Sequence, residues 1–327
     1  MARLEGLRGA VTGEERVADT SQPRSRSFDL VGRRNLWFAI SLLVILPGIF
    51  FMVTRGFLLG IDFQGGTEFF VKFQQPTTLA AVESAVAAEN SNGVVQQATN
   101  GSYVIRTPPL DPVHAQQFRD DLAKKVGPID PSASAINEVG GTVASETVTR
   151  AFEAVLAASL CLLFYLAFRF RNVPGGWRSG FQFGGSALLA LLHDVAVLTG
   201  IYSILGRGLG LRIGEIDSLF MTAVLTVVGF SVHDTIVVFD RIRENMVKAQ
   251  RLTFEQVVNL SVMQTAARSI ITSFTVVLVL LALFLFGGET LKGFVLALLI
   301  GIVSGTYSSI FNASPLLVVW RRLQGAR

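Results

Sequence analysis

The sequence predicts an α-helical polytopic membrane protein with six transmembrane helices and a ferredoxin-like α+β domain between the first two. Half of its 327 residues are hydrophobic, 16% are charged and the mean hydropathy is +0.51, values that exclude an ordinary soluble enzyme. Between the first two apolar runs, the pattern changes to short alternating strands and helices. Six apolar runs are each long enough to cross a bilayer, and they cover residues 36–53, 151–168, 181–205, 218–239, 260–286 and 294–320.

Arginine residues lie beside the apolar runs and predict the orientation of the chain. Segments rich in arginine remain in the cytoplasm, so both termini are expected there. The predicted order is a cytoplasmic tail (1–34), the first transmembrane helix (35–54), an external domain (55–145), and the other five helices (146–327) with a cytoplasmic segment at 240–259. The basic residues form no single basic face, so binding to nucleic acid is not expected.

The inserted segment has the element order of a ferredoxin-like domain. Its patterns predict β-α-β-β-α-β. Cys161, the only cysteine, lies in an apolar run, so no internal disulfide can form and the domain must fold on its own core. Such a module can grip or shape a polypeptide, or serve as a spacer. The predicted strands are 59–63, 67–73, 94–98, 103–107 and 133–139, and the predicted helices are 77–89 and 112–126.

A glycine-rich motif, Gly60 to Thr67, lies among the first strands. The adjacent Gly65 and Gly66 predict a bulge or a tight turn where two backbones approach closely. The motif is not typical of nucleotide binding, because the sequence has no Gly-Lys pair and no βαβ fingerprint follows.

The fourth span contains a carboxylate, Asp234, about five residues short of its charged end, which includes Asp240 and Arg241. A charge at that depth costs about 3 kcal/mol and needs a partner, water or a proton. Arg268 is the only charge in the fifth apolar run, and it lies as far after Arg251 as Asp234 lies before it. A symmetric loop would therefore bring the two groups to similar depth. We interpret them as a proton relay; the alternative is a polar contact that only fixes helix packing.

Two histidines accompany the intramembrane acids. His193 precedes Asp194 in the third span, and His233 precedes Asp234. Successive helical residues lie about 100° apart, so only one member of each pair can face a given partner. For His193, a packing role and a relay role remain open. The coupling ion would be the proton, with no other cofactor, and a proton-motive force of roughly 180 mV supplies about 4 kcal/mol per proton.

Enzymatic sites fit the sequence poorly. An aspartyl protease would need two carboxylates close together, whereas Asp194 and Asp234 are offset by about 7 Å along the membrane normal. The sequence contains no G-x-S-x-G elbow and no H-E-x-x-H zinc motif. We therefore expect a protein that is not an enzyme.

Near the fifth span, Thr253 and Gln256 have capping-box spacing and predict a short interfacial helix that leads into that span.

Residues 228–245, VGFSVHDTIVVFDRIREN, resemble the fourth-span signature of the SecF family of bacterial protein-export membrane subunits. His233 departs from the family pattern, in which asparagine is more frequent. Further similar motifs occur in the family's order along the chain: residues 60–67, 139–142, 193–195, 264–265, 268–270 and 272–273.

The resemblance implies half of a twelve-helix transporter of the resistance-nodulation-division group, in the bacterial cytoplasmic (inner) membrane. SecF pairs with SecD, here expected as a separate chain because this one starts with its own Met and a polar tail. The pair works with the SecYEG translocon to draw unfolded polypeptides outward, using the proton gradient. The alternatives are a small-molecule exporter half and a passive scaffold for translocon assembly. The implied relay residues are Asp234, Arg268, Asp194, His193 and His233, and the motif residues are Gly60, Asp62, Gly65, Gly66, Gly140, Gly141, Asp240 and Arg241.

Overall fold

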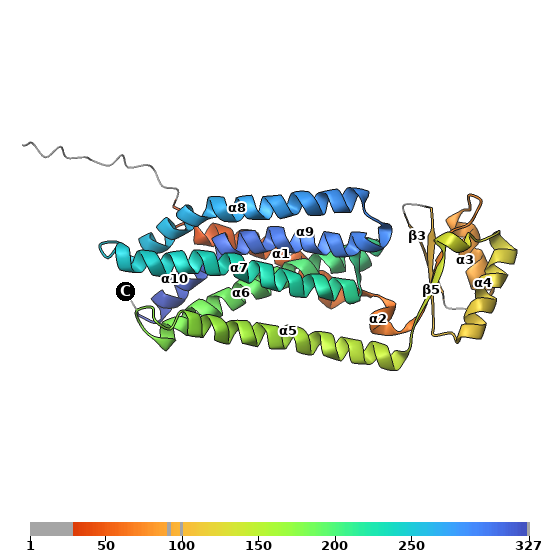
Figure 1. The fold of residues 1–327 in the computed structure, drawn as a ribbon, viewed down its shortest axis with the longest axis horizontal. Coiled ribbons are helices and arrows are strands. Elements are labelled where there is room, and N and C mark those ends of the chain that lie inside the picture. The colour runs from red at the N-terminus through yellow and green to blue at the C-terminus, as the bar shows by residue number, and fades with distance from the viewer. Residues whose placement is uncertain (1–28, 90–92, 99–100, 326–327) are drawn as a thin grey trace, which may run out of the picture.

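A bundle of long helices makes up most of the molecule, and a small domain caps one end of it (Figure 1). The computed structural model describes residues 29–89, 93–98 and 101–325. Most of the predicted tail, residues 1–28, lies outside this range.

Six membrane-length apolar segments form the bundle within the described part of the chain, which confirms the predicted number of spans. The last segment is interrupted by a π-helical turn, η4 (Ser309–Ala313), that separates two α-helices. The helices are α1 (Arg34–Arg55), α5 (Gly141–Arg169), α6 (Trp177–Ser203), α7 (Ser218–Lys248), α8 (Phe254–Phe286), α9 (Glu289–Ser308) and α10 (Ser314–Leu323).

Helices α5 and α8 start well before their apolar runs, by ten and six residues. Helix α5 begins ten residues before the predicted span because its polar first turns are also helical; the Thr147 hydroxyl, for example, donates to the Val143 carbonyl at 2.8 Å. The capping box of Thr253 and Gln256 is present, but it starts α8 itself. The predicted interfacial helix is therefore the first part of α8, which continues into the fifth span without a break and ends at Phe286.

The inserted domain has the predicted ferredoxin-like topology. Its sheet has the order β3-β4-β2-β5 with antiparallel neighbours, and two helices cover one face. Phe69, Ile105 and Leu122 are almost fully buried in the core between sheet and helices. The elements are β2 (Gly66–Val71), α3 (Leu79–Ala88), β3 (Val94–Gln97), β4 (Tyr103–Thr107), α4 (Pro112–Val126), the short 3-10 helix η1 (Pro131–Ala133) and β5 (Ala135–Val139).

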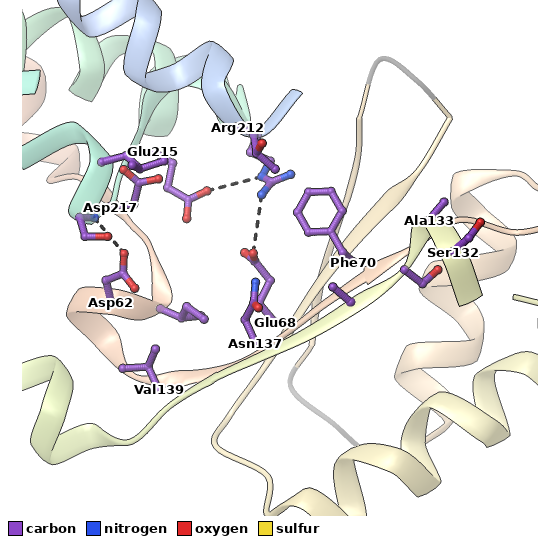
Figure 2. Close-up of a pocket in the computed structure, with 16 residues that line it drawn as sticks. Asp62, Glu68, Phe70, Ser132, Ala133, Asn137, Val139, Arg212, Glu215 and Asp217 are labelled. Atoms are coloured by element: carbon purple, nitrogen blue, oxygen red, sulfur yellow. Dashed lines mark hydrogen bonds and ion pairs between the residues drawn. The ribbon is translucent and has the colours of Figure 1, made fainter. Parts of the chain in front are cut away.

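The predicted strand at 59–63 is wrong. Only β1 (Leu58–Leu59) is extended, and it pairs in parallel with β6 (Glu215–Ile216), just before α7. Residues Ile61–Gln64 form a short helix, α2, because the chain turns at Gly60 to follow the end of the bundle. Asp62 of α2 then accepts a hydrogen bond from the Ser218 amide at 2.8 Å, at the start of α7 (Figure 2).

The close backbone approach predicted at the glycine pair is present. Gly65 and Gly66 have φ values of +72° and +137°, which side-chain-bearing residues rarely adopt. A Cβ atom on Gly66 would lie 2.7 Å from the Thr107 carbonyl oxygen. Glycine is required at this position by both backbone conformation and space.

We predict that Gly66→Ala destabilises the inserted domain by about 1–3 kcal/mol, because it adds backbone strain and a steric clash. Hydrogen exchange of β2 and β4 in the full-length protein measures the change. Gly140→Ala is the matched control, since Gly140 has an ordinary φ of −66° and an added Cβ would have no neighbour within 4 Å. Equal exchange in the two variants would contradict this prediction.

Candidate intramembrane site

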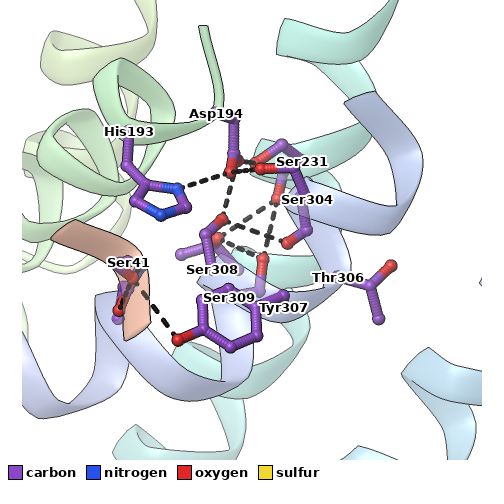
Figure 3. A network of polar contacts seen from close by, with 12 residues as sticks. Ser41, His193, Asp194, Ser231, Ser304, Thr306, Tyr307, Ser308 and Ser309 are labelled. Carbon is purple, nitrogen blue, oxygen red and sulfur yellow. Dashed lines mark hydrogen bonds and ion pairs between the residues drawn. The ribbon is translucent and has the colours of Figure 1, made fainter. Parts of the chain in front are cut away.

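A fully buried carboxylate, Asp194 of α6, joins three helices at the centre of the bundle (Figure 3). Its Oδ1 accepts from the Ser304 hydroxyl at 2.7 Å and lies 3.0 Å from His193 Nδ1. Its Oδ2 accepts from the Ser231 and Ser308 hydroxyls at 2.6 and 2.7 Å. Four hydrogen-bond donors thus surround the two carboxylate oxygens.

The helices around Asp194 approach closely because small residues line their contact. A Cβ on Gly305 of α9 would lie 2.9 Å from the Ser231 Cβ of α7. The serine network continues into the π-helical turn, where Ser309 bonds Thr235 of α7 at 2.8 Å. Such turns inside helices occur often at functional sites.

The serine donors were missed by reasoning from the sequence. Ser304 and Ser308 lie four residues apart and therefore on one face of α9. That spacing in an apolar span was an available signal, because hydroxyl groups in a membrane helix often bond to a neighbouring helix.

His193 lies between this network and the outer face of the bundle. Because Asp194 can only accept, Nδ1 is assigned as the donor in their contact. Nε2 is buried and has no hydrogen-bond partner among the described residues. The ring stacks on Tyr307 of α9, with centroids 6.0 Å apart. His193 and Asp194, both predicted as site residues, therefore belong to the same polar cluster.

Asp234 has a very different environment. It is 4% exposed, and its Oδ2 has no hydrogen-bond partner in the described part of the chain. It faces Ser269 and Ser273 on the adjoining helix, α8. A buried carboxylate with an incomplete set of donors is the group whose protonation state is most easily changed.

The predicted partner of Asp234 lies close by but not in contact with it. Arg268 precedes Ser269 on α8, so the two groups lie at similar depth, as expected. No ion pair within 4 Å joins these two described residues, although the Arg268 charge acts on the carboxylate. Both Arg268 and His233 are exposed on the surface of the bundle. The relay role of the two groups therefore stays a prediction, and the structure adds that Arg268 lies on the exposed side of α8.

The remaining motif residues tie both ends of α7 to other elements. Asp240 pairs with Arg169 of α5 at 2.9 Å, and the Arg241 side chain donates to the Gln264 side-chain oxygen of α8 at 2.6 Å. At the opposite end, Asp62 bonds the first amide of α7, as described above. These residues hold α7, the helix that carries Asp234, in position.

Among the described residues, no group of three His, Cys, Asp or Glu side chains could hold a metal ion.

Comparison with known proteins identifies the family. The family described as protein export membrane protein SecD/SecF, C-terminal, matches residues 119–323, and the SecD/SecF GG motif matches residues 50–77. Protein translocase subunit SecF from Thermobaculum terrenum is 45% identical over 304 residues, which cover 89% of this chain and 93% of the relative. The subunit of the same name from Haemophilus influenzae is 37% identical and covers 86% and 82%.

Two crystal structures of SecDF are similar to this chain. The translocon-associated membrane protein SecDF from Thermus thermophilus has a TM-score of 0.78 at 31% identity, and the match covers 90% of this chain. A super-membrane-facing form of SecDF has a TM-score of 0.63 at 30% identity and covers 92%. In both cases this chain covers 39% of the SecDF chain.

These matches define a multi-pass membrane protein of the protein-export class, and the chain belongs to the SecD/SecF family. Within that family, its curated relatives are SecF subunits of the protein translocase. The resemblance noted in the sequence motifs is therefore confirmed.

We predict that Asp194→Ala lowers the free energy of unfolding by about 2–5 kcal/mol, because it leaves four buried donors without their acceptor. Asp194→Asn should cost less, since one carbonyl oxygen remains. Thermal unfolding in detergent, followed by tryptophan fluorescence, measures both. Ser186→Ala is the control: this hydroxyl of α6 is equally buried but has no hydrogen-bond partner among the described residues. A loss no larger than that of the control would contradict the assignment.

Proposed function

We propose that this protein is a SecF subunit that assists Sec-dependent export of unfolded polypeptides across the bacterial cytoplasmic membrane. The proton-motive force would drive it through an intramembrane relay centred on Asp234. The observation that carries the proposal is a buried carboxylate, Asp234, with an oxygen that has no partner among the described residues. It lies beside two exposed ionisable groups, His233 and Arg268, on the surface of transmembrane helices.

The exposed groups imply a partner. A charged side chain facing lipid at mid-membrane costs about 3 kcal/mol, so Arg268 needs a protein surface or water in contact with it. We infer that a second six-helix half, SecD, covers the face that includes His233 and Arg268. Transporters built from two similar halves place their ion sites at such an interface. The name SecDF of the similar crystal structures supports this assignment.

In the proposed mechanism, Asp234 changes its charge as water reaches it from one side and then the other. The ionised form is stabilised by Arg268, and the protonated form can be buried without a counter-charge. His233 lies beside the path, and Asp194 keeps the surrounding helices in place with His193. Each proton provides about 4 kcal/mol at roughly 180 mV, enough to bias two conformations. No catalytic chemistry is proposed for the chain.

The link to export is helix α7. It is continuous from Ser218 to Lys248, so it connects Asp234 to the contact with Asp62 near the inserted domain. We place that domain outside and both termini inside, because Arg169, Arg171 and Arg322 lie at the other end of the bundle. Outside, the domain would act on polypeptides that leave the SecYEG channel.

We predict that Asp234→Asn abolishes the gradient-stimulated part of protein export while assembly with SecD stays normal, because an amide cannot take up and release the proton. Export into vesicles, with and without a proton gradient, is the measurement. The same substitution tests the alternatives, since a passive scaffold would keep the wild-type rate and an exporter half would show no effect of the gradient on protein export.

The matched control is Glu153→Gln. Glu153 is also a carboxylate on a transmembrane helix, but it is 57% exposed and pairs with Arg150. Export at the wild-type rate is expected for this variant. Equal losses of gradient-stimulated export in Asp234→Asn and Glu153→Gln would contradict the proposed relay.

We predict that SecD protects the Arg268 position from thiol reagents. In a Cys161→Ser background, Arg268→Cys should react at least about tenfold more slowly when the partner is co-purified, because the interface excludes the reagent. Ile270→Cys is the control, since Ile270 is 55% exposed and lies two residues further along α8, about 200° around the helix from Arg268. If labelling at position 268 is the same with and without SecD, this face is not the interface.

A further inference from the structure

Both covalent connections between the inserted domain and the bundle pass through glycine pairs. Gly65 and Gly66 precede β2, and Gly140 and Gly141 follow β5. The two pairs lie against each other, because a Cβ on Gly65 would be 3.2 Å from Gly141 Cα. Two adjacent connections without side chains have the properties of a hinge.

Beyond these glycines, the uncovered face of the sheet lies over the end of the bundle, and a cavity of about 490 Å³ separates them (Figure 2). Phe70 of β2 points into it, and the Arg212 guanidinium lies 4.7 Å from the ring centroid. Arg212 belongs to the short 3-10 helix η3 (Arg212–Gly214), which precedes β6. Carboxylates dominate the lining, with Asp62, Glu68, Glu215 and Asp217.

Ion pairs cross from the sheet to the bundle. Each side contributes one arginine and one glutamate: Glu68 and Arg106 from the sheet, Arg212 and Glu215 from the bundle. Arg106 bonds Glu68 at 2.9 Å and also bonds Glu215. Arg212 lies 3.7 Å from both glutamates. The glutamate side chains are only 10% and 11% exposed, so these pairs are little screened by solvent.

We propose that Glu68, Arg106, Arg212 and Glu215 form a latch that holds the inserted domain against the bundle. The glycine pairs are the hinge about which the domain moves, and protons on the domain's side of the membrane close the latch. The latch goes beyond the proposed function, since docking of the domain can be measured without export and without the Asp234 relay.

The direction of the proton effect follows from the surroundings of Glu215. Burial raises its pKa above the ordinary value, against the pull of Arg106 and Arg212, while Glu68 and Asp217 raise it further. Burial and the nearby Asp62 likewise raise the pKa of Asp217, against Arg212 and the hydrogen bond from the Phe220 amide. The other titratable groups nearby are Lys292, which lines an adjacent cavity, and Tyr202 of α6, which faces Asp217.

In the open state, Glu215 regains water and loses its neighbours Arg106 and Glu68 on the sheet, so its pKa returns toward the ordinary value. The docked state therefore binds more protons, and docking tightens as the pH falls from neutral toward the ordinary carboxyl range. The docking constant can change by up to about tenfold for each pH unit in that window. At higher pH, the excess of carboxylates over arginines weakens docking.

Distances between two spin labels test the latch in the full-length protein in lipid nanodiscs. The labels replace Gln116, exposed on α4, and Leu209, 63% exposed at the end of the bundle, in a Cys161→Ser background. We expect one narrow distance at about pH 5.5, and at about pH 8 a second, longer population that reduces the docked fraction at least about twofold.

Variants separate the latch from a structural effect. Glu215→Gln imitates the protonated group and should stay docked at both pH values, whereas Arg106→Gln should show the longer distances at both. Glu146→Gln, which changes an exposed glutamate on α5, should keep the wild-type pH response. The latch is overturned if the wild-type distances do not depend on pH, or if Arg106→Gln gives the wild-type distribution.

Discussion

The hydrogen bonding of one buried anion, Asp194, determines how the membrane part of this protein is built. A carboxylate without water is costly, so the two helices packed against α6, namely α7 and α9, must present hydroxyl groups to it at the same depth. That requirement explains the serines of α9, the small residues that allow α7 and α9 to touch, and the π-helical turn that directs Ser309 toward α7. The arrangement leaves Asp234, one helix away, as the acid with an incomplete set of donors.

Two carboxylates in one bundle thus have different surroundings. Asp194 is saturated with donors, while Asp234 has an oxygen without a partner among the described residues, and the proposed mechanism gives them different roles for that reason. The exposed polar groups around Arg268 support the proposal that a second half completes the site. Membership of the SecD/SecF family agrees with a site that is shared between two halves.

Much of this fold could be predicted because hydropathy and strand alternation are local signals. The six spans and the element order of the inserted domain follow from residues near one another in sequence. The short strand at residues 59–63 was wrong because pairing with Glu215 and Ile216, far along the chain, turns the segment instead. The outward direction of Arg268 and the ion pairs of Arg106 with Glu215 depend on helix rotation and domain placement, which no local pattern encodes.

Helix α7 has 31 residues and therefore a length of about 46 Å, well beyond the roughly 30 Å of hydrocarbon that it crosses. It behaves as a stiff rod that is held at both ends, by Asp62 on one side and by the partners of Asp240 on the other. A small tilt around the middle of such a lever displaces its two tips in opposite directions. A small rearrangement near the middle of α7 would thereby displace the ends of the helix at both aqueous surfaces at once.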